Sequence, residues 1–177
     1  MKQSEINWTS VRALAEKYDH FLFDCDGVLW HGDEIHIGQA FRNIEWLESI
    51  GKKCYFITNN ASLSRESMVQ KMESSVFEYK NADVSKMYPS STLAAQYVVQ
   101  RLPNVKKVRF IGSDEMGEEL RSNGLRTIGG TNEDGADEPF VYENLKHYDF
   151  DDDVGAVICG IDFQVNYKKI ILASTYI

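Results

Sequence analysis

An apolar segment that ends in two closely spaced carboxylates is the feature that most constrains this chain. Phe21-Leu22-Phe23 runs directly into Asp24-Cys25-Asp26-Gly27. A short apolar run that stops at acidic residues and glycine is typical of a buried parallel strand. Such a strand delivers its last residues to the edge where ligands bind in open α/β sheets. We therefore predict an α/β fold with Asp24 and Asp26 at that edge.

A second apolar segment of the same kind, Cys54-Tyr55-Phe56-Ile57, ends in Thr58-Asn59-Asn60. Between the two segments, apolar residues recur at helical spacing and Gly51 ends the pattern. These residues are Ala40, Phe41, Ile44, Leu47 and Ile50. Strand, helix and strand in this order predict a βαβ unit, whose crossover is right-handed almost without exception. The ends of both strands would then meet at the same edge of the sheet.

The acidic residues are suited to phosphoryl transfer. The carboxylate of Asp24 can attack phosphorus and form an aspartyl phosphate. Because the attacking group and the phosphate are both anionic, a divalent cation is needed to bridge them, and Mg²⁺ is usually held by one or two carboxylates with phosphate oxygens and waters. Asp26 can protonate the leaving alcohol and later deprotonate the attacking water. Gly27 lets the backbone approach the phosphate closely.

The second strand end carries hydrogen-bond donors. The hydroxyl of Thr58 and the amides of Asn59 and Asn60 can donate to phosphate oxygens, and a helix that begins near Ser64 would add N–H groups and a positive dipole end. An ordinary turn is the alternative for these residues. For Asp24 and Asp26 the alternatives are residues that cap an ordinary turn or the start of a calcium loop, but a calcium loop follows a helix, whereas an apolar run of Phe and Leu precedes this motif.

Together these motifs resemble the haloacid dehalogenase superfamily of phosphotransferases. Its first motif is a hydrophobic strand that ends in Asp-x-Asp-Gly. The residues that follow here, Val28-Leu29-Trp30, resemble those of the branch that contains 4-nitrophenylphosphatases, phosphoglycolate phosphatases and pyridoxal phosphatases. Its second motif is a Ser or Thr, which this branch follows with Asn-Asn, a small residue and a nearby Arg. The matching residues here are Thr58, Asn59, Asn60, Ala61 and Arg65.

The resemblance implies a Rossmann-like parallel sheet core with an inserted α/β cap. It also implies a Mg²⁺-dependent phosphomonoesterase of small phosphorylated metabolites, of the phosphoglycolate or 4-nitrophenyl phosphate type, that acts through an aspartyl phosphate. Asp24 and Asp26 would be catalytic, and the carboxylate of Asp24 and the backbone carbonyl of Asp26 would bind the metal. The residues that would bind phosphate are Gly27, Thr58, Asn59, Asn60 and Arg65.

Two motifs of the family do not occur in this sequence, namely the Lys of the third and the Gly-Asp with a following Asp of the fourth. We therefore expect a fragment or a natural short form, with residues 1–103 as the N-terminal part of the core and 104–177 as the first part of the cap. Two functions stay open. One is the phosphomonoesterase, and the other is a catalytically weak homologue that binds phosphate or pairs with another subunit.

The chain stops inside an apolar helical segment that contains Ile170, Ile171 and Leu172. We expect the apolar face of this segment to lack a partner and the sheet of the core to be open. Exposed sheet edges and apolar patches promote association, which predicts homodimers or aggregates of the chain.

The net charge of −8 over 177 residues argues against nucleic acid or an anionic membrane surface as a partner. The three cysteines, Cys25, Cys54 and Cys159, are widely spaced, which favours reduced intracellular thiols. The sequence shows no signal peptide and no run of about 18 apolar residues. We therefore expect a cytoplasmic protein.

The rest of the chain predicts more helices and strands. Helices are expected at residues 8–18, 64–72, 91–102, 114–123 and from 165 onward, and strands at 108–111, 125–128 and 154–159. Two acidic stretches, at 133–138 and 149–153, are expected to be solvated loops.

Overall fold

The computed structural model describes residues 8–132 and 141–177 of the chain. These residues form two compact units, each with its own sheet. The first unit comprises residues up to Thr58 together with Arg65–Tyr88, and the second comprises Asn59–Ser64 together with Pro89–Ile177. The predicted boundary at residue 103 lies inside the second unit, and the assignment of a core and a cap stays a prediction.

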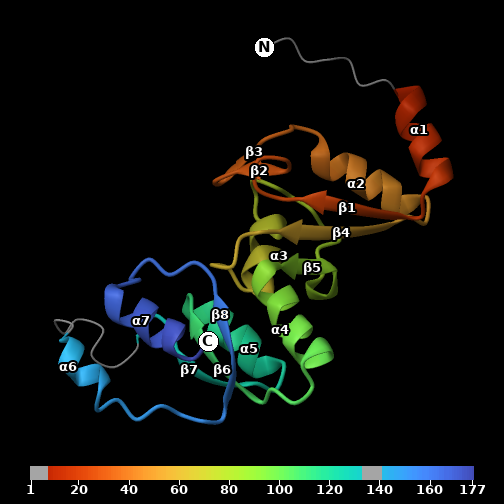
Figure 1. Cartoon of the computed structure of the whole chain (residues 1–177). Helices are drawn as coiled ribbons and strands as arrows, with labels where there is room; N and C mark the ends of the chain where they lie inside the picture. Colours follow the sequence, from red (N-terminus) through yellow and green to blue (C-terminus); the bar gives the residue numbers. More distant parts are fainter. Residues whose placement is uncertain (1–7, 133–140) are drawn as a thin grey trace. The chain divides into compact units, whose positions relative to one another are not determined.

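The first unit is built on strands β1, β4 and β5, in that order across the sheet (Figure 1). Their bounds are His20–Asp24, Lys53–Thr58 and Met87–Pro89. β1 and β4 run parallel, with Phe23 opposite Phe56 and Asp24 opposite Ile57. The helix α2 (Ala40–Ser49) lies between them in the chain, so the predicted strand, helix and strand are confirmed.

The helix α2 packs against β4 through one apolar face. The buried residues of this face are Ala40, Phe41, Ile44 and Leu47. Gly51 has a φ of +83°, a left-handed conformation that commonly ends helices because glycine has no Cβ. Ile50 follows the last helical residue and is 46% exposed, so its predicted place on the buried face is wrong.

The shortest elements are absent from the sequence-based prediction. They are the hairpin strands β2 (Trp30–His31) and β3 (Glu34–Ile35), the strand β5, the 3₁₀ helix Val84–Lys86 and the helix α6 (Tyr142–Leu145). Strands of two or three residues are too short for an alternation of apolar and polar residues to show. The two other helices of the first unit confirm the prediction, and they are α1 (Trp8–Lys17) and α3 (Arg65–Glu73).

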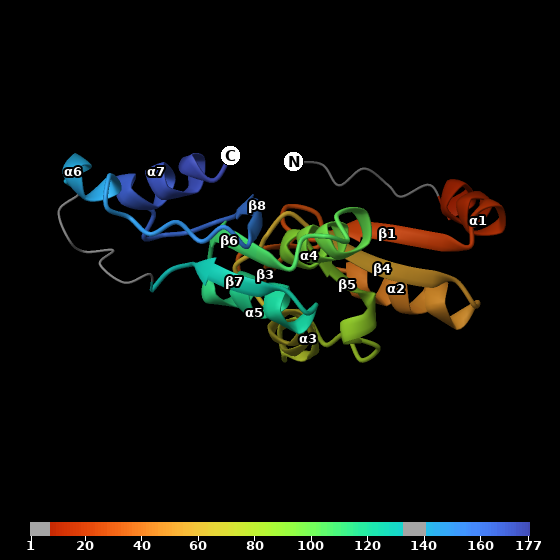
Figure 2. The same cartoon turned by 60° about the horizontal axis from the view of Figure 1, so that its bottom comes forward.

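In the second unit, β6 lies between β7 and β8 and pairs with both in parallel (Figure 2). The helix α7 packs on β6, and α4 packs on α5. The helices and strands predicted for this part of the chain are confirmed. They are α4 (Ser90–Arg101), β6 (Lys107–Ile111), α5 (Asp114–Ser122), β7 (Arg126–Gly129), β8 (Val154–Cys159) and α7 (Tyr167–Thr175). No helix among the described residues has the length and apolar character needed to cross a bilayer.

The acidic stretch at 149–153 is more than a solvated loop. Lys107 on β6 donates a hydrogen bond to the carboxylate of Asp151, and Arg126 on β7 lies 3.2 Å from the carboxylate of Asp153. The neighbouring ammonium of Lys107 holds the pKa of Asp151 below its usual value. The prediction is wrong for Asp151, which is partly buried and ties the loop before β8 to β6, whereas Asp153 stays solvated in an exposed ion pair. The other acidic stretch, Glu133, Asp134, Asp137 and Glu138, lies outside the described residues.

The helix α7 has a buried face. Leu172 is 1% exposed and Ala173 is also buried, whereas Ile170 is 51% exposed. The predicted absence of a packing partner is therefore wrong for Leu172, because the helix lies on β6. The helix begins at Tyr167 rather than at 165, since the side chain of Asn166 accepts a hydrogen bond from the N–H of Lys169 and caps it.

A buried ion pair joins the start of α7 to the loop after β8. The Nζ of Lys169 lies 2.8 Å from Oδ2 of Asp162, and the two side chains are 2% and 0% exposed. The same ammonium donates to the backbone carbonyl of Thr131 at 3.1 Å. Because neither group reaches water, each depends on the other to offset the cost of its burial.

We expect Asp162→Asn to lower the free energy of unfolding by about 3–5 kcal/mol, because it leaves the ammonium of Lys169 buried without a counter-charge. The matched control is Asp153→Asn, which breaks an ion pair whose side chains are 60% and 66% exposed and which we expect to cost about 0–1 kcal/mol. Urea unfolding followed by circular dichroism measures both. Equal losses in the two variants would contradict a special role for the buried pair.

Candidate active site

The C-terminal end of β1 carries the two carboxylates that the sequence singles out. Asp24 is the last residue of the strand, and both Asp24 and Asp26 are exposed. One oxygen of Asp24 accepts a hydrogen bond from the N–H of Cys25 at 3.0 Å. Because Asp24 is opposite Ile57 in the parallel pair, Thr58 at the end of β4 lies at the same edge of the sheet. The predicted edge is therefore the one at which these three polar residues gather.

A tight turn follows β1. The N–H groups of Val28, Leu29 and Trp30 all donate to the carbonyl of Cys25, at 3.2, 2.8 and 3.2 Å. Gly27 closes the turn by donating to the carbonyl of Trp30 at 2.7 Å, and its φ is +82°. A Cβ at Gly27 would meet no atom within 4 Å, so the conformation and not crowding requires glycine here. Its contact with phosphate stays a prediction.

Both oxygens of the Asp26 carboxylate accept hydrogen bonds. The indole Nε1 of Trp30 donates to Oδ1 at 2.9 Å, and the hydroxyl of Thr58 donates to Oδ2 at 3.0 Å. Thr58 is 3% exposed, and 32 positions separate it from Asp26 in the chain. The structure therefore brings Asp26 and Thr58 together. A hydroxyl has one hydrogen, so the predicted donation from Thr58 to phosphate requires this hydroxyl to rotate away from Asp26.

The other predicted phosphate-binding residues are divided between the units. The carbonyl of Asn59 accepts a hydrogen bond from the hydroxyl of Ser90 at 2.9 Å. The side-chain oxygen of Asn60 accepts from the N–H and the hydroxyl of Ser62, at 2.8 and 2.7 Å. Arg65 is the first residue of α3 and is half-buried. Arg65 thus belongs to the same unit as the two carboxylates and Thr58, whereas Asn59 and Asn60 belong to the second unit.

Two residues at the site carry roles that the sequence-based prediction missed. Trp30 is 2% exposed, and its ring lies with its centroid 6.5 Å from that of Phe41 and 5.8 Å from that of Phe77. The Nζ of Lys71 lies 5.0 Å from the centroid of the Trp30 ring. The sequence marks Trp30 as part of Val28-Leu29-Trp30 and as the fourth residue after Asp26, but neither pattern predicts a hydrogen bond to that carboxylate. Lys71 belongs to no motif.

The oxygen atoms at this edge suit a hard cation. Within the described residues, no group of three or more His, Cys, Asp and Glu side chains could hold a metal ion. The carboxylate of Asp24 and the carbonyl of Asp26 are oxygen donors, and Mg²⁺ commonly binds through one or two carboxylates while waters and phosphate oxygens complete its shell. The donor set therefore fits Mg²⁺ with substrate and water as further ligands.

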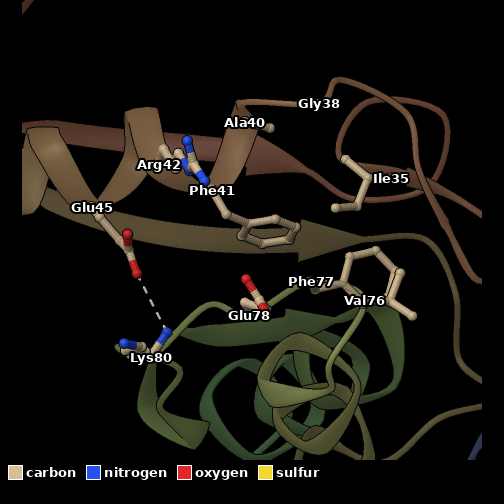
Figure 3. A pocket seen from close by; sticks show the side chains of 10 residues that line it. All are labelled: Ile35, Gly38, Ala40, Phe41, Arg42, Glu45, Val76, Phe77, Glu78 and Lys80. Atoms are coloured by element: carbon tan, nitrogen blue, oxygen red, sulfur yellow. Dashed lines mark hydrogen bonds between the residues drawn. The ribbon is translucent and has the colours of Figure 1, made fainter.

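A pocket of about 330 Å³ opens elsewhere on the first unit (Figure 3). Phe41 on α2 and Phe77 in the loop after α3 line it, together with charged side chains such as Arg42 and Glu78. Neither carboxylate of the site nor Thr58 lines this pocket. The candidate active site is therefore the exposed strand edge and not this cavity.

Cys25 lies between the two carboxylates but points into the core, since it is 0% exposed. Burial, followed by the negative charges of Asp26 and Asp24, raises the pKa of its thiol to about 12. Burial also raises the pKa of the Cys54 thiol to about 11. All three cysteines are free thiols, and Cys159 is the exposed one. Since the thiolate is the reactive form, the two buried thiols should be inert.

We expect one of the three thiols of the native chain to react quickly with an aromatic disulfide reagent at pH 8, because Cys159 alone is exposed. The variant Cys159→Ser should lose the fast phase, and the remaining two thiols should react only in denaturant. A fast phase that persists in Cys159→Ser would show that Cys25 or Cys54 opens readily to solvent.

A family model described as haloacid dehalogenase-like hydrolase matches residues 21–126. The chain belongs to this family. It is 37% identical over 168 residues to a 4-nitrophenylphosphatase of Schizosaccharomyces pombe, a match that covers 94% of this chain and 55% of that protein. It is 34% identical over 163 residues to phosphoglycolate phosphatase 2 of Arabidopsis thaliana, covering 92% of this chain and 52% of the relative. The predicted family and branch are thus confirmed.

Solved structures show the same fold. A 4-nitrophenylphosphatase from Thermotoga maritima matches with a TM-score of 0.67 and 18% identity, covering 92% of this chain and 52% of that one. A glycerol phosphate phosphatase from Mycobacterium tuberculosis in complex with magnesium matches with a TM-score of 0.66 and 21% identity, covering 92% and 42%. These matches confirm the predicted α/β fold. The chain spans about half the length of the relatives that it matches.

Proposed function

We propose that this chain forms part of a Mg²⁺-dependent phosphomonoesterase of small phosphorylated metabolites. The observation that carries the proposal is the strand edge where Asp24 is exposed and Asp26 is held by Thr58. Relatives that are named as phosphatases of 4-nitrophenyl phosphate and phosphoglycolate support this substrate class. Because the chain spans about half of their length, the activity is proposed for the whole protein that contains it.

In the first step, a carboxylate oxygen of Asp24 attacks phosphorus while the bond from phosphorus to the ester oxygen breaks. Protonated Asp26 gives its proton to the leaving oxygen, so that the product departs as a neutral alcohol. Asp24 is then an aspartyl phosphate and Asp26 is a carboxylate. The exposure of Asp24 at the strand end leaves room for the in-line approach that this displacement needs.

In the second step, Asp26 takes a proton from a water molecule whose oxygen attacks phosphorus. The bond between phosphorus and the Asp24 oxygen breaks, which releases inorganic phosphate and restores both aspartates. The same carboxylate therefore serves as acid and then as base, and its position must stay fixed between the steps. The hydrogen bond from the indole N–H of Trp30 supports that position, and Thr58 adds a second one while its hydroxyl is not turned to phosphate.

The carboxylate of Asp24 and the backbone carbonyl of Asp26 would hold Mg²⁺. When bound, the ion offsets the repulsion between the attacking carboxylate and the phosphate. A chain with a net charge of −8 makes that help more necessary. The residues proposed to bind phosphate oxygens are Gly27, Thr58, Asn59, Asn60 and Arg65.

Pairing of two copies and a cytoplasmic location belong to the same proposal. Apolar side chains are exposed around the loop between β8 and α7, including Phe163 at 86% and Tyr167 at 65%. A homodimer that covers them would reduce this exposed apolar area. Three free thiols are consistent with a reducing compartment.

We expect Asp24→Asn to lower turnover by at least about a thousandfold, or roughly 4 kcal/mol, because the amide keeps the shape but removes the attacking anion. The assay uses the full-length protein with 4-nitrophenyl phosphate and Mg²⁺. Asp19→Asn, at the opposite end of β1 with a side chain that is 85% exposed, is the matched control and should keep turnover within about twofold. Retention of more than a tenth of the activity by Asp24→Asn would contradict the assignment of Asp24 as the nucleophile.

Thr58→Val should raise the activation free energy by about 1–3 kcal/mol and so lower turnover. The variant removes the hydroxyl that binds Asp26 and that is proposed to reach the phosphate. Thr58→Ser keeps the hydroxyl and should retain most of the activity. Steady-state kinetics on the full-length protein measures both variants. Full activity in Thr58→Val would show that Thr58 only shapes the turn after β4 and does not bind phosphate.

A further inference from the structure

We propose that Trp30 is a positioning residue for Asp26, and that Lys71 in turn fixes the indole ring of Trp30. The proposal rests on the proposed phosphatase function, in which Asp26 exchanges protons with the leaving alcohol and with water. Trp30 touches neither reactant in this scheme. It acts through the single hydrogen bond that its indole N–H donates to Oδ1 of Asp26 at 2.9 Å.

The carboxylate of Asp26 is held from two sides. Trp30 donates to one oxygen from the start of β2, and Thr58 donates to the other from the end of β4. An exposed aspartate without such partners rotates among several side-chain conformations. Here a rotation of the carboxylate breaks at least one hydrogen bond. The two donors together set the direction of the Asp26 carboxylate in the free site, and the Trp30 donor still holds it when Thr58 turns to phosphate.

The indole ring that supplies one of these donors is itself fixed. Its ring lies nearly parallel to that of Phe41, at an angle of 14°, and meets the ring of Phe77 edge-on at 65°. With 2% exposure, Trp30 is enclosed by its neighbours. A buried indole N–H also needs an acceptor, and Asp26 is that acceptor. The hydrogen bond thus gives the buried indole N–H its acceptor and also orients the carboxylate.

Lys71 ties this arrangement to α3. Its ammonium lies 5.0 Å from the centroid of the Trp30 ring, within the range of a cation–π interaction. The same ammonium donates to the carbonyl of Gly32 at 2.6 Å and lies 3.4 Å from the carboxylate of Asp33. Gly32 and Asp33 form the turn between β2 and β3, so Lys71 holds the hairpin that carries Trp30. The contacts run from α3 through the hairpin to Asp26, all within the first unit.

A packing role for Trp30 is the competing explanation, and the substitution Trp30→Phe separates the two. Phenylalanine keeps an aromatic ring among Phe41 and Phe77 but has no N–H. In the full-length protein, we expect Trp30→Phe to lower kcat about tenfold, because a hydrogen bond to a charged group is lost, while KM changes less than about twofold. Trp46→Phe, at a half-buried position on α2, is the matched control and should leave both constants unchanged.

A second measurement does not depend on activity. The chain has three tryptophans, and their ¹⁵N-labelled indole groups give separate NMR signals. The signal missing in Trp30→Phe identifies Trp30. We expect Asp26→Ala to shift that signal and to leave the other two in place, while Asp19→Ala shifts none of them.

The outcomes separate this proposal from the proposed function. If the full-length protein hydrolyses no phosphate monoester, the phosphatase assignment fails, while the NMR result still tests the link between Trp30 and Asp26. An unmoved Trp30 signal in Asp26→Ala overturns the proposal whatever the activity. A shifted signal together with an unchanged kcat in Trp30→Phe overturns the positioning role and leaves only a structural hydrogen bond.

Discussion

Parallel pairing of β1 with β4 is the constraint on which the candidate site depends. Parallel strands end at the same edge of a sheet, so the residues that follow each strand meet there. Asp26 and Thr58 reach hydrogen-bonding distance, at 3.0 Å, for this reason. An antiparallel pair would place them at opposite ends of the sheet. The helix α2 makes the parallel arrangement possible, because parallel neighbours need a long crossover connection.

The carboxylate of Asp26 serves the fold and the site together. Trp30 and Thr58 are both buried, and a buried donor without an acceptor costs about 1–3 kcal/mol. Asp26 supplies an acceptor to each of them. Removing this carboxylate would therefore weaken the first unit as well as its chemistry. Asp24 differs, since its only described partner is the adjacent N–H of Cys25, and it stays available for attack.

Much of this fold could be predicted from apolar runs, and the details of the site could not. β1, β4, β6 and β8 could be predicted because apolar residues dominate each of these short segments, and the helices because their apolar residues recur at helical spacing. The contact between Trp30 and Asp26 depends on the left-handed conformation of Gly27, which no residue pattern states. The partners of Asp151 and Asp162 were missed for a related reason, since the number of charges in a segment does not reveal which ones meet in space.

The residue between the two carboxylates explains why they can share one edge. Residues along an extended chain alternate between two faces, so Asp24 and Asp26 point outward while Cys25 points into the core. A pKa of about 12 keeps the Cys25 thiol neutral at physiological pH. A third negative charge between two carboxylates would add to the repulsion that an incoming phosphate already meets. The neutral, buried thiol therefore fills the core beneath the site without adding a negative charge to those of the two aspartates.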